Sequence, residues 1–195
     1  MRVIRYIFWG FAIIALVVVA VHQLTHMTET KSATEPTFQP EFTLANHFGE
    51  EVNATTYRGN WSLVFFGFTN CPDICPTTLA EFGRIMDGLG ADAFKLKPLF
   101  ITIDPERDRV ADVAKYVSAF HPAIVGLTGT EAQIAEAARS FKAYYEKQPQ
   151  ESAPNGYTMG HTSAVYLISP EGVFVRTYGY GTPPGEITKD LQNRL

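Results

Sequence analysis

The stretch Phe66–Ala80, FGFTNCPDICPTTLA, contains the only two cysteines of the chain, Cys71 and Cys75. The apolar run Trp61–Phe68 leads into them, and its β-branched and aromatic residues are typical of a buried strand. Beyond the cysteines, apolar residues recur with helical spacing and predict a helix over Pro76–Leu89. Both sulfur atoms should therefore lie at the amino-terminal end of a helix, where the helix dipole lowers a thiol pKa and favours the thiolate.

Strand and helix patterns alternate through the rest of residues 41–195. Strands are predicted at Phe42–Leu44, Glu51–Asn53, Trp61–Phe68, Pro98–Ile103, Ala123–Leu127, Thr162–Ile168 and Val173–Tyr178. Helices are predicted at Pro76–Leu89, Val110–Phe120, Thr130–Tyr145 and Pro184–Leu195, with a polar loop over Glu146–Gly160. This order predicts an α/β sandwich of the thioredoxin type, with a central, mostly parallel sheet and flanking helices. Because parallel strands place their chemistry at their carboxyl ends, Cys71, Cys75 and Asp104 should share one edge of the sheet.

The N-terminus is predicted to be a membrane anchor outside this domain. Tyr6–Leu24 contains no Asp, Glu, Lys or Arg. As a helix it would be about 28 Å long, close to the roughly 30 Å hydrocarbon core of a bilayer. The positive-inside rule places residues 1–5, which carry two arginines, in the cytoplasm, and residues 25–40 form a flexible tether. A cleaved signal peptide, with Val18-Val19-Ala20 as the cleavage site, is the alternative. Either way the domain faces an oxidising compartment.

Composition limits the classes of partner. The chain has 195 residues, of which 46% are hydrophobic, enough for one well-packed domain. Its net charge is −4 at pH 7, and no basic patch stands out along the sequence. Nucleic acid is therefore not an expected partner.

The cysteine pair has three interpretations. A structural disulfide is sterically allowed, but its ring would be so small that it would constrain the unfolded chain little. A thiol–disulfide oxidoreductase would use the two residues as a redox pair. A metal site is the third interpretation, because two thiolates are soft ligands that select Cu(I), whereas zinc normally takes four ligands.

A metal site would need a further ligand, and the five histidines are the candidates. Two of them fall in the predicted anchor and tether. His47 lies in a turn and His121 precedes a proline at a helix end, so surface or capping roles are expected for both. His161 stands at the start of the predicted strand Thr162–Ile168, after a loop with two glycines that lets the backbone bend. It is the candidate third ligand.

Three motifs of this chain resemble the Sco/SenC family: CPDICP at Cys71–Pro76, IDPERD at Ile103–Asp108, and YTMGHT at Tyr157–Thr162. The resemblance covers roughly residues 38–195. Sco proteins resemble thioredoxin in fold and deliver copper to the dinuclear CuA centre of cytochrome c oxidase subunit II. By this resemblance, Cys71, Cys75 and His161 would be the ligands of Cu(I) or Cu(II).

The resemblance implies a membrane-anchored copper metallochaperone, a carrier rather than an enzyme in the strict sense. Its domain would face the periplasm from a bacterial inner membrane, and its partners would include a periplasmic copper donor and a thioredoxin-like reductant. The alternative is a thiol–disulfide oxidoreductase that reduces the CuA cysteines or serves redox signalling. Many members carry Asp where this chain has Gly160, so no outer carboxylate is expected there. Asp73, Asp104 and Asp108 are candidates for outer-shell or docking groups, with loop solvation and turn capping as the alternative.

Overall fold

Seven strands form one sheet in residues 38–195, the part of the chain that this computed structural model describes. They are β1 (Thr43–Asn46), β2 (Glu51–Asn53), β3 (Trp61–Gly67), β4 (Leu96–Thr102), β5 (Val125–Thr128), β8 (Val165–Ile168) and β9 (Phe174–Tyr178). Their spatial order is β2-β1-β5-β4-β3-β8-β9. The central strands β5, β4 and β3 run parallel, while β1–β2, β1–β5, β3–β8 and β8–β9 pair antiparallel. The predicted parallel core is thus found, with antiparallel strands on both sides of it.

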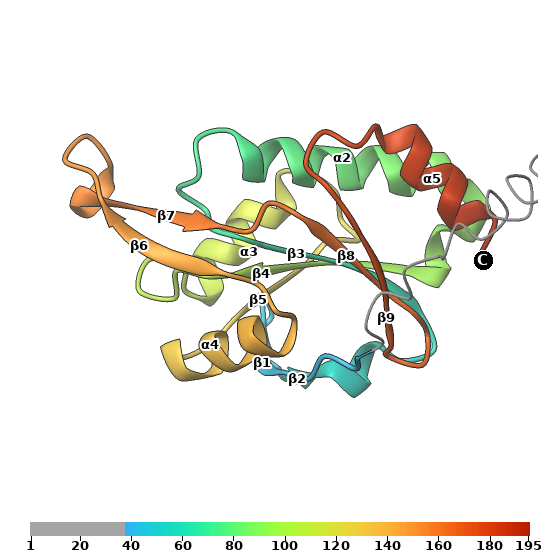
Figure 1. Cartoon of the computed structure of the whole chain (residues 1–195), viewed down its shortest axis with the longest axis horizontal. Helices are drawn as coiled ribbons and strands as arrows, with labels where there is room; N and C mark the ends of the chain where they lie inside the picture. The colour runs from blue at the N-terminus through green and yellow to red at the C-terminus, as the bar shows by residue number, and fades with distance from the viewer. Residues whose placement is uncertain (1–37) are drawn as a thin grey trace, which may run out of the picture. The chain divides into compact units, whose positions relative to one another are not determined.

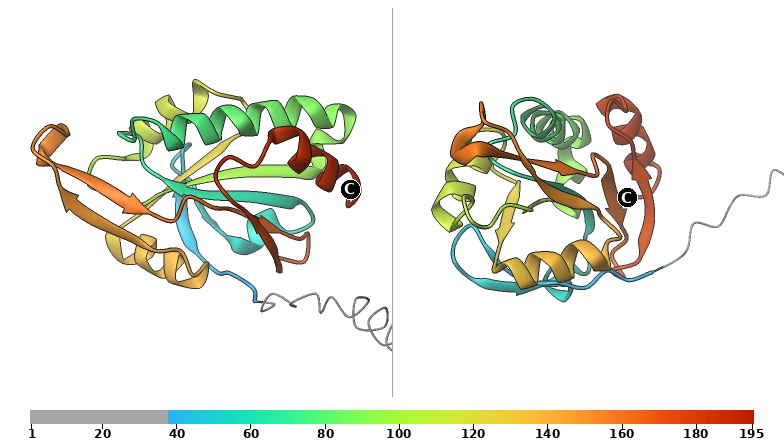
Figure 2. Two further views of the ribbon diagram at one scale, coloured as in Figure 1. Left: turned by 45° about the horizontal axis from the view of Figure 1, so that its top comes forward. Right: turned by 60° about the vertical axis from the view of Figure 1, so that its left-hand side comes forward.

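Helices cover both faces of this sheet (Figures 1 and 2). They are α2 (Ile74–Leu89), α3 (Val110–Ser118), α4 (Glu131–Ser140) and α5 (Pro184–Gln192), with short 3-10 turns at Ala54–Tyr57, Gly90–Lys95 and Pro154–Gly156. Right-handed crossovers from β3 to β4 and from β4 to β5 place α2 and α3 on one face. The C-terminal helix α5 packs against α2, and α4 lies on the opposite face. The predicted thioredoxin-type α/β sandwich is confirmed.

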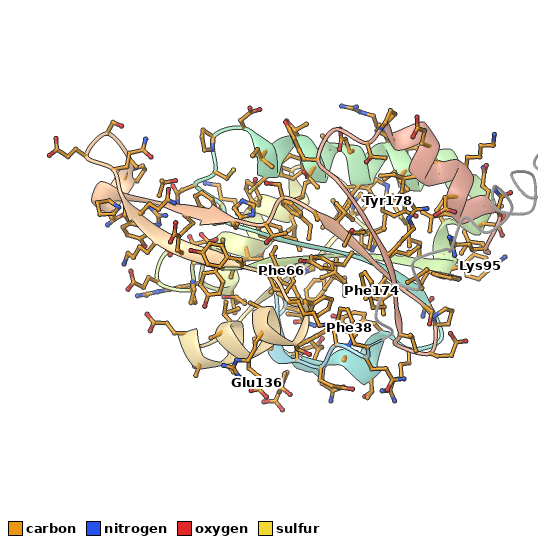
Figure 3. All side chains as sticks on the ribbon, viewed as in Figure 1. Phe38, Phe66, Lys95, Glu136, Phe174 and Tyr178 are labelled. Carbon is orange, nitrogen blue, oxygen red and sulfur yellow. The ribbon has the colours of Figure 1, made fainter. Side chains whose placement is uncertain are left out.

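An aromatic cluster fills the layer between the sheet and α4. Phe66 of β3 meets Phe141, just after α4, edge to face at 5.2 Å between ring centroids. At the start of the described chain, Phe38 stacks on Phe174 at 4.7 Å, and Figure 3 shows these two side chains next to each other. Residues 38–40, the last of the predicted tether, therefore already contact the domain.

The prediction of a polar loop over Glu146–Gly160 is wrong, because this segment forms most of a β-hairpin. Strands β6 (Tyr145–Pro149) and β7 (Tyr157–His161) pair antiparallel as a separate two-stranded sheet. Asn155 and Gly156 close the turn with φ values of 58° and 75°, the left-handed region that this dipeptide tolerates well. The hairpin projects from the end of the molecule at which α2 begins (Figures 1 and 2).

Two helix boundaries also differ from the prediction. Helix α4 ends at Ser140 instead of Tyr145, because Lys142 adopts φ 56° and the N–H of Ala143 bonds the carbonyl of Ala138, as in a Schellman motif. Helix α2 begins at Ile74, two residues before the predicted Pro76. The other predicted strands and helices are found with ends shifted by at most three residues.

The predicted cytoplasmic segment 1–5, the anchor 6–24 and nearly all of the tether 25–40 lie outside the described residues. Within residues 38–195, no helix has the length and apolar character needed to cross a bilayer.

Candidate metal centre

The carboxyl end of β3 and the first turn of α2 bring the two cysteines together. Cys75 is the second residue of α2, where backbone N–H groups have no partner inside the helix. Its N–H donates instead to the Sγ atom of Cys71, at 3.3 Å. The backbone of β3 lies directly behind the pair, because a Cβ atom at Gly67 would stand 2.9 Å from the Sγ atom of Cys75.

His161 reaches the same place from the far end of β7. The structure assigns it to the end of the β6–β7 hairpin, not to the start of a strand Thr162–Ile168 as predicted. Its Nδ1 atom lies 3.0 Å from the carbonyl oxygen of Thr162. Because a carbonyl only accepts, Nδ1 carries the proton, and Nε2 keeps its lone pair. Nε2 lies 3.8 Å from the Sγ atom of Cys75, and the ring packs edge-on against Phe65 and Phe68.

The donor atoms of Cys71, Cys75 and His161 all lie within 4.8 Å of one another. Cys75 is fully buried, whereas Cys71 and His161 are partly exposed. Cys71 and His161 border a depression of about 380 Å³, whose rim includes Pro72, Asp73, Ile74, Thr158, Gly160 and Ser163. The three residues singled out in the sequence thus meet in space, at a place open to solvent.

The two thiols have pKa values shifted in opposite directions. A hydrogen bond from the Cys75 thiol lowers the pKa of Cys71 to about 4, with the backbone N–H groups of Asp73 and Cys75 adding to the effect against the opposing influence of burial. The same hydrogen bond, together with burial, raises the pKa of Cys75. At neutral pH the pair therefore holds a thiolate at Cys71 and a thiol at Cys75. A soft cation that displaced this proton would meet two thiolates and an imidazole, a donor set that suits copper.

A sequence model of the SCO1/SenC family matches residues 30–195 of this chain. The chain belongs to this family. The mitochondrial SCO2 homolog of Mus musculus is 39% identical over 159 residues, which make up 80% of this chain and 62% of that protein. This SCO1/SenC chain thus spans less than two thirds of that relative's length.

Solved structures of the SCO1/SenC family share the fold. ScoI of Bradyrhizobium japonicum, solved with copper bound, has a TM-score of 0.75 and 37% identity, covering 81% of this chain and 99% of that one. BsSco, described as a member of the Sco family of cytochrome c oxidase assembly proteins, has a TM-score of 0.64 and 28% identity, covering 81% of this chain and 94% of that one. The solved structures that share this fold therefore include a protein with copper bound and a member of a family of cytochrome c oxidase assembly proteins.

In this SCO1/SenC protein the three candidate aspartates lie outside the Cys-Cys-His group. Asp73 is exposed at the start of α2, and its side chain makes no capping hydrogen bond. Asp104 and Asp108 are buried, and both serve as hydrogen-bond acceptors within the fold. His47 and His121 accept the backbone N–H groups of Gly126 and Ala123 through Nδ1, and within the described residues neither joins the Cys-Cys-His group.

Sequence reasoning missed two residues beside this centre, Arg107 and Tyr157. Tyr157 donates its hydroxyl to Asp104 at 2.9 Å, and the guanidinium of Arg107 lies 3.8 Å from the centre of the Tyr157 ring. Tyr157 could have been found from its alternation with Met159 and His161, which places all three on one face of a strand. The partners of Arg107 include backbone carbonyls of distant residues, which leave no trace in the sequence.

Proposed function

We propose that this protein is a copper metallochaperone, which binds copper through Cys71, Cys75 and His161 and delivers it to the CuA centre of cytochrome c oxidase subunit II. The observation that carries the proposal is the convergence of two sulfur atoms and one imidazole nitrogen within 4.8 Å. Related proteins solved with copper bound, such as ScoI of Bradyrhizobium japonicum, support it.

The donor set suits a cargo that must be held and then released. Two thiolates and one neutral imidazole give a Cu(I) complex a net charge of −1 and leave coordination positions free. The depression in front of Cys71 and His161 gives an incoming thiolate of the target a route to the metal. Transfer can then proceed by ligand exchange, one donor at a time. Cu(II), which favours nitrogen ligands more than Cu(I) does, would depend more on His161.

The wider setting follows from the sequence outside the described residues. Residues 6–24 would anchor the protein in a bacterial inner membrane, with the domain in the periplasm. A periplasmic copper donor would load the site. A thioredoxin-like reductant would keep Cys71 and Cys75 as thiols, because this compartment favours disulfides.

Copper titration of the full, reduced chain tests the site. We expect one Cu(I) per chain, and we expect Cys71→Ser and Cys75→Ser to abolish binding. His161→Ala should weaken copper binding, and Cu(II) binding most, by about tenfold or more. His121→Ala is the matched control, since its imidazole caps a turn elsewhere. Full affinity in either serine variant would refute the two-thiolate site.

A thiol–disulfide oxidoreductase is the second candidate, favoured by the different exposure of the two cysteines. Cys71 is partly exposed and Cys75 is buried behind it, as expected of an attacking and a resolving thiol. The Cys71 thiolate would attack a disulfide of the target, and Cys75 would release the reduced target, leaving this chain with a Cys71–Cys75 disulfide. This chemistry does not need His161. Cells with His161→Ala that assemble the oxidase normally at limiting copper, while Cys71→Ser cells do not, would favour the reductase.

A further inference from the structure

The loop Asp104–Asp108, which follows β4, contacts both segments that carry the residues of the proposed metal site. Within residues 38–195, none of its side-chain hydrogen bonds goes to Cys71, Cys75 or His161 themselves. The loop thus stands behind the site and can act on it only through the segments that it holds.

One end of the loop holds the cysteine segment. The carboxylate of Asp108 accepts the backbone N–H of Thr69 at 2.9 Å and also the Thr69 hydroxyl. It is completely buried and accepts a third hydrogen bond, from the Thr102 hydroxyl of β4 at 2.6 Å. Thr69 precedes Cys71 by two residues. Asp108 therefore fixes the turn between β3 and the first cysteine to the neighbouring strand.

The rest of the loop, residues 104–107, holds the β6–β7 hairpin. Arg107 donates from Nη1 to the carbonyl oxygens of Pro154, at 2.8 Å, and Tyr157, at 3.1 Å. Its Nε pairs with the carboxylate of Asp104, which also accepts the Tyr157 hydroxyl. Lys147 of β6 adds an ion pair with Glu106 at 2.6 Å. These contacts grip the hairpin near its turn.

The hairpin depends on such contacts, because β6 and β7 share no strand pairing with the seven-stranded sheet in the described part of the chain. His161 is the last residue of β7, four residues after Tyr157 on the same face of the strand. We propose that Arg107 and Tyr157 are positioning residues, which hold the hairpin so that the Nε2 atom of His161 stays beside the Sγ atom of Cys75. This inference rests on the proposed copper function.

Arginine is suited to this task by its shape. Its planar guanidinium presents donors in several fixed directions, so one side chain can pair with a carboxylate and two carbonyls at once. Only 9% of the Arg107 side chain is exposed, and its ring contact with Tyr157 adds a cation–π interaction. Lysine keeps the charge but offers a single ammonium group, so Arg107→Lys should release the hairpin without removing the positive charge.

Hydrogen–deuterium exchange on the full, copper-free chain tests the attachment itself. We expect Arg107→Lys and Tyr157→Phe to speed amide exchange in residues 145–161 about tenfold while leaving β3, β4 and β5 unchanged. Tyr157→Phe removes only a hydroxyl, so it remains informative if Arg107→Lys unfolds. Arg176→Lys, at an exposed arginine paired with Asp190, is the matched control. Unchanged exchange in residues 145–161 for Tyr157→Phe and for a folded Arg107→Lys would overturn the inference.

Copper binding tests whether the attachment acts through His161. We expect Arg107→Lys to weaken Cu(II) binding about tenfold and to shift the sulfur-to-copper absorption band, because the imidazole of His161 would no longer be held beside the sulfur atoms. In a His161→Ala background the same substitution should have no further effect, because the ligand that it positions is gone. An equal loss in both backgrounds would overturn the positioning role. If the unmodified chain bound no copper, the proposed function would fail, and the exchange experiment alone would decide on the attachment.

Discussion

The Nε2 atom of His161 lies 3.8 Å from the Sγ atom of Cys75, although the two residues are 86 positions apart. Cys75 is held by the first turn of α2 and by the backbone of β3. His161 is held by a hairpin outside the main sheet. The site is therefore assembled from one rigid half and one half whose position depends on side-chain contacts.

The rigid half is tested by Gly67→Ala. The added Cβ atom would stand 2.9 Å from Cys75 Sγ, from a Phe100 ring carbon and from a Phe65 ring carbon, closer than real Cβ contacts allow. We expect a loss of about 1–3 kcal/mol in the free energy of unfolding, as is typical of overpacking. Copper affinity should fall with it, because Cys75 must move. Urea unfolding and copper titration measure the two effects.

Gly185→Ala in α5 is the control for this prediction, because no atom lies within 4 Å of its added Cβ. It should leave copper affinity unchanged and change stability by less than about 1 kcal/mol. A Gly67→Ala protein as stable as the unmodified chain would contradict the close approach of β3 to Cys75.

The rigid half could be predicted from the sequence because its signals are local. The apolar run before Cys71 and the helical repeat after Cys75 identify a strand and a helix, and residue types alone nominate the soft ligands. The same holds for the start of α4, where Thr130 and Gln133 have the spacing of a capping box and the Gln133 N–H donates to the Thr130 hydroxyl. Local propensity and tertiary contacts agree in these segments.

The half of the site that the β6–β7 hairpin supplies could be predicted only in part. Strand β6 is polar on both faces because it lies outside the main sheet, so it lacks the alternation that reveals a strand. Asn155-Gly156 was the available signal of the hairpin turn. The end of α4 has no such signal in the sequence, because the residue that adopts the left-handed conformation there is a lysine, Lys142, where glycine is usual. Contacts such as that of Arg107 with the Pro154 carbonyl, 47 positions away, cannot be inferred from side-chain patterns.

The hairpin turn gives a second prediction. Gly156 has φ 75° and open space around its Cβ position, so Gly156→Ala adds backbone strain without a clash. The cost should be about 1–2 kcal/mol, concentrated in the hairpin. Because His161 lies at the end of β7, we expect weaker Cu(II) binding in a titration. Gly181→Ala imposes the same kind of strain at φ 85°, again without a clash, but far along the chain from the site. If both variants changed Cu(II) affinity equally, the hairpin would have no special role.

Asp108 gives a prediction about pH. Burial, the largest influence, raises the pKa of its carboxyl above the ordinary value. The folded state therefore keeps this proton over a pH range in which the unfolded chain has released it. The contribution of Asp108 to stability is full below the unfolded-state pKa of about 3.9 and decreases as the pH rises through the folded-state pKa. Asn does not titrate. The stability lost in Asp108→Asn, about 1–3 kcal/mol from the hydrogen bonds of Thr69 and Thr102, should be larger near pH 4 than near pH 7.

Urea unfolding of the copper-free proteins at both pH values measures this difference. Asp87→Asn, at a side chain that is 79% exposed, controls for the general effect of removing a carboxylate. If the stability lost in Asp108→Asn increased toward neutral pH, the folded state would favour the ionised carboxylate of Asp108 over the protonated acid.

The last prediction concerns the unequal exposure of the two thiols. Cys71 borders the depression and is partly exposed, whereas the side chain of Cys75 is 0% exposed beneath it. In the reduced, copper-free chain, iodoacetamide should modify Cys71 and leave Cys75 intact until the protein unfolds, because only Cys71 can be approached by the reagent. Peptide mass analysis measures the two sites separately. Cys71→Ser should remain unlabelled in native buffer and become labelled in urea, and Cys75→Ser should be labelled in both. Prior addition of one equivalent of Cu(I) should protect Cys71. Equal labelling of both cysteines in the native chain would mean that Cys75 is accessible, and neither an attacking-and-resolving pair nor a site closed on one side would then describe this protein.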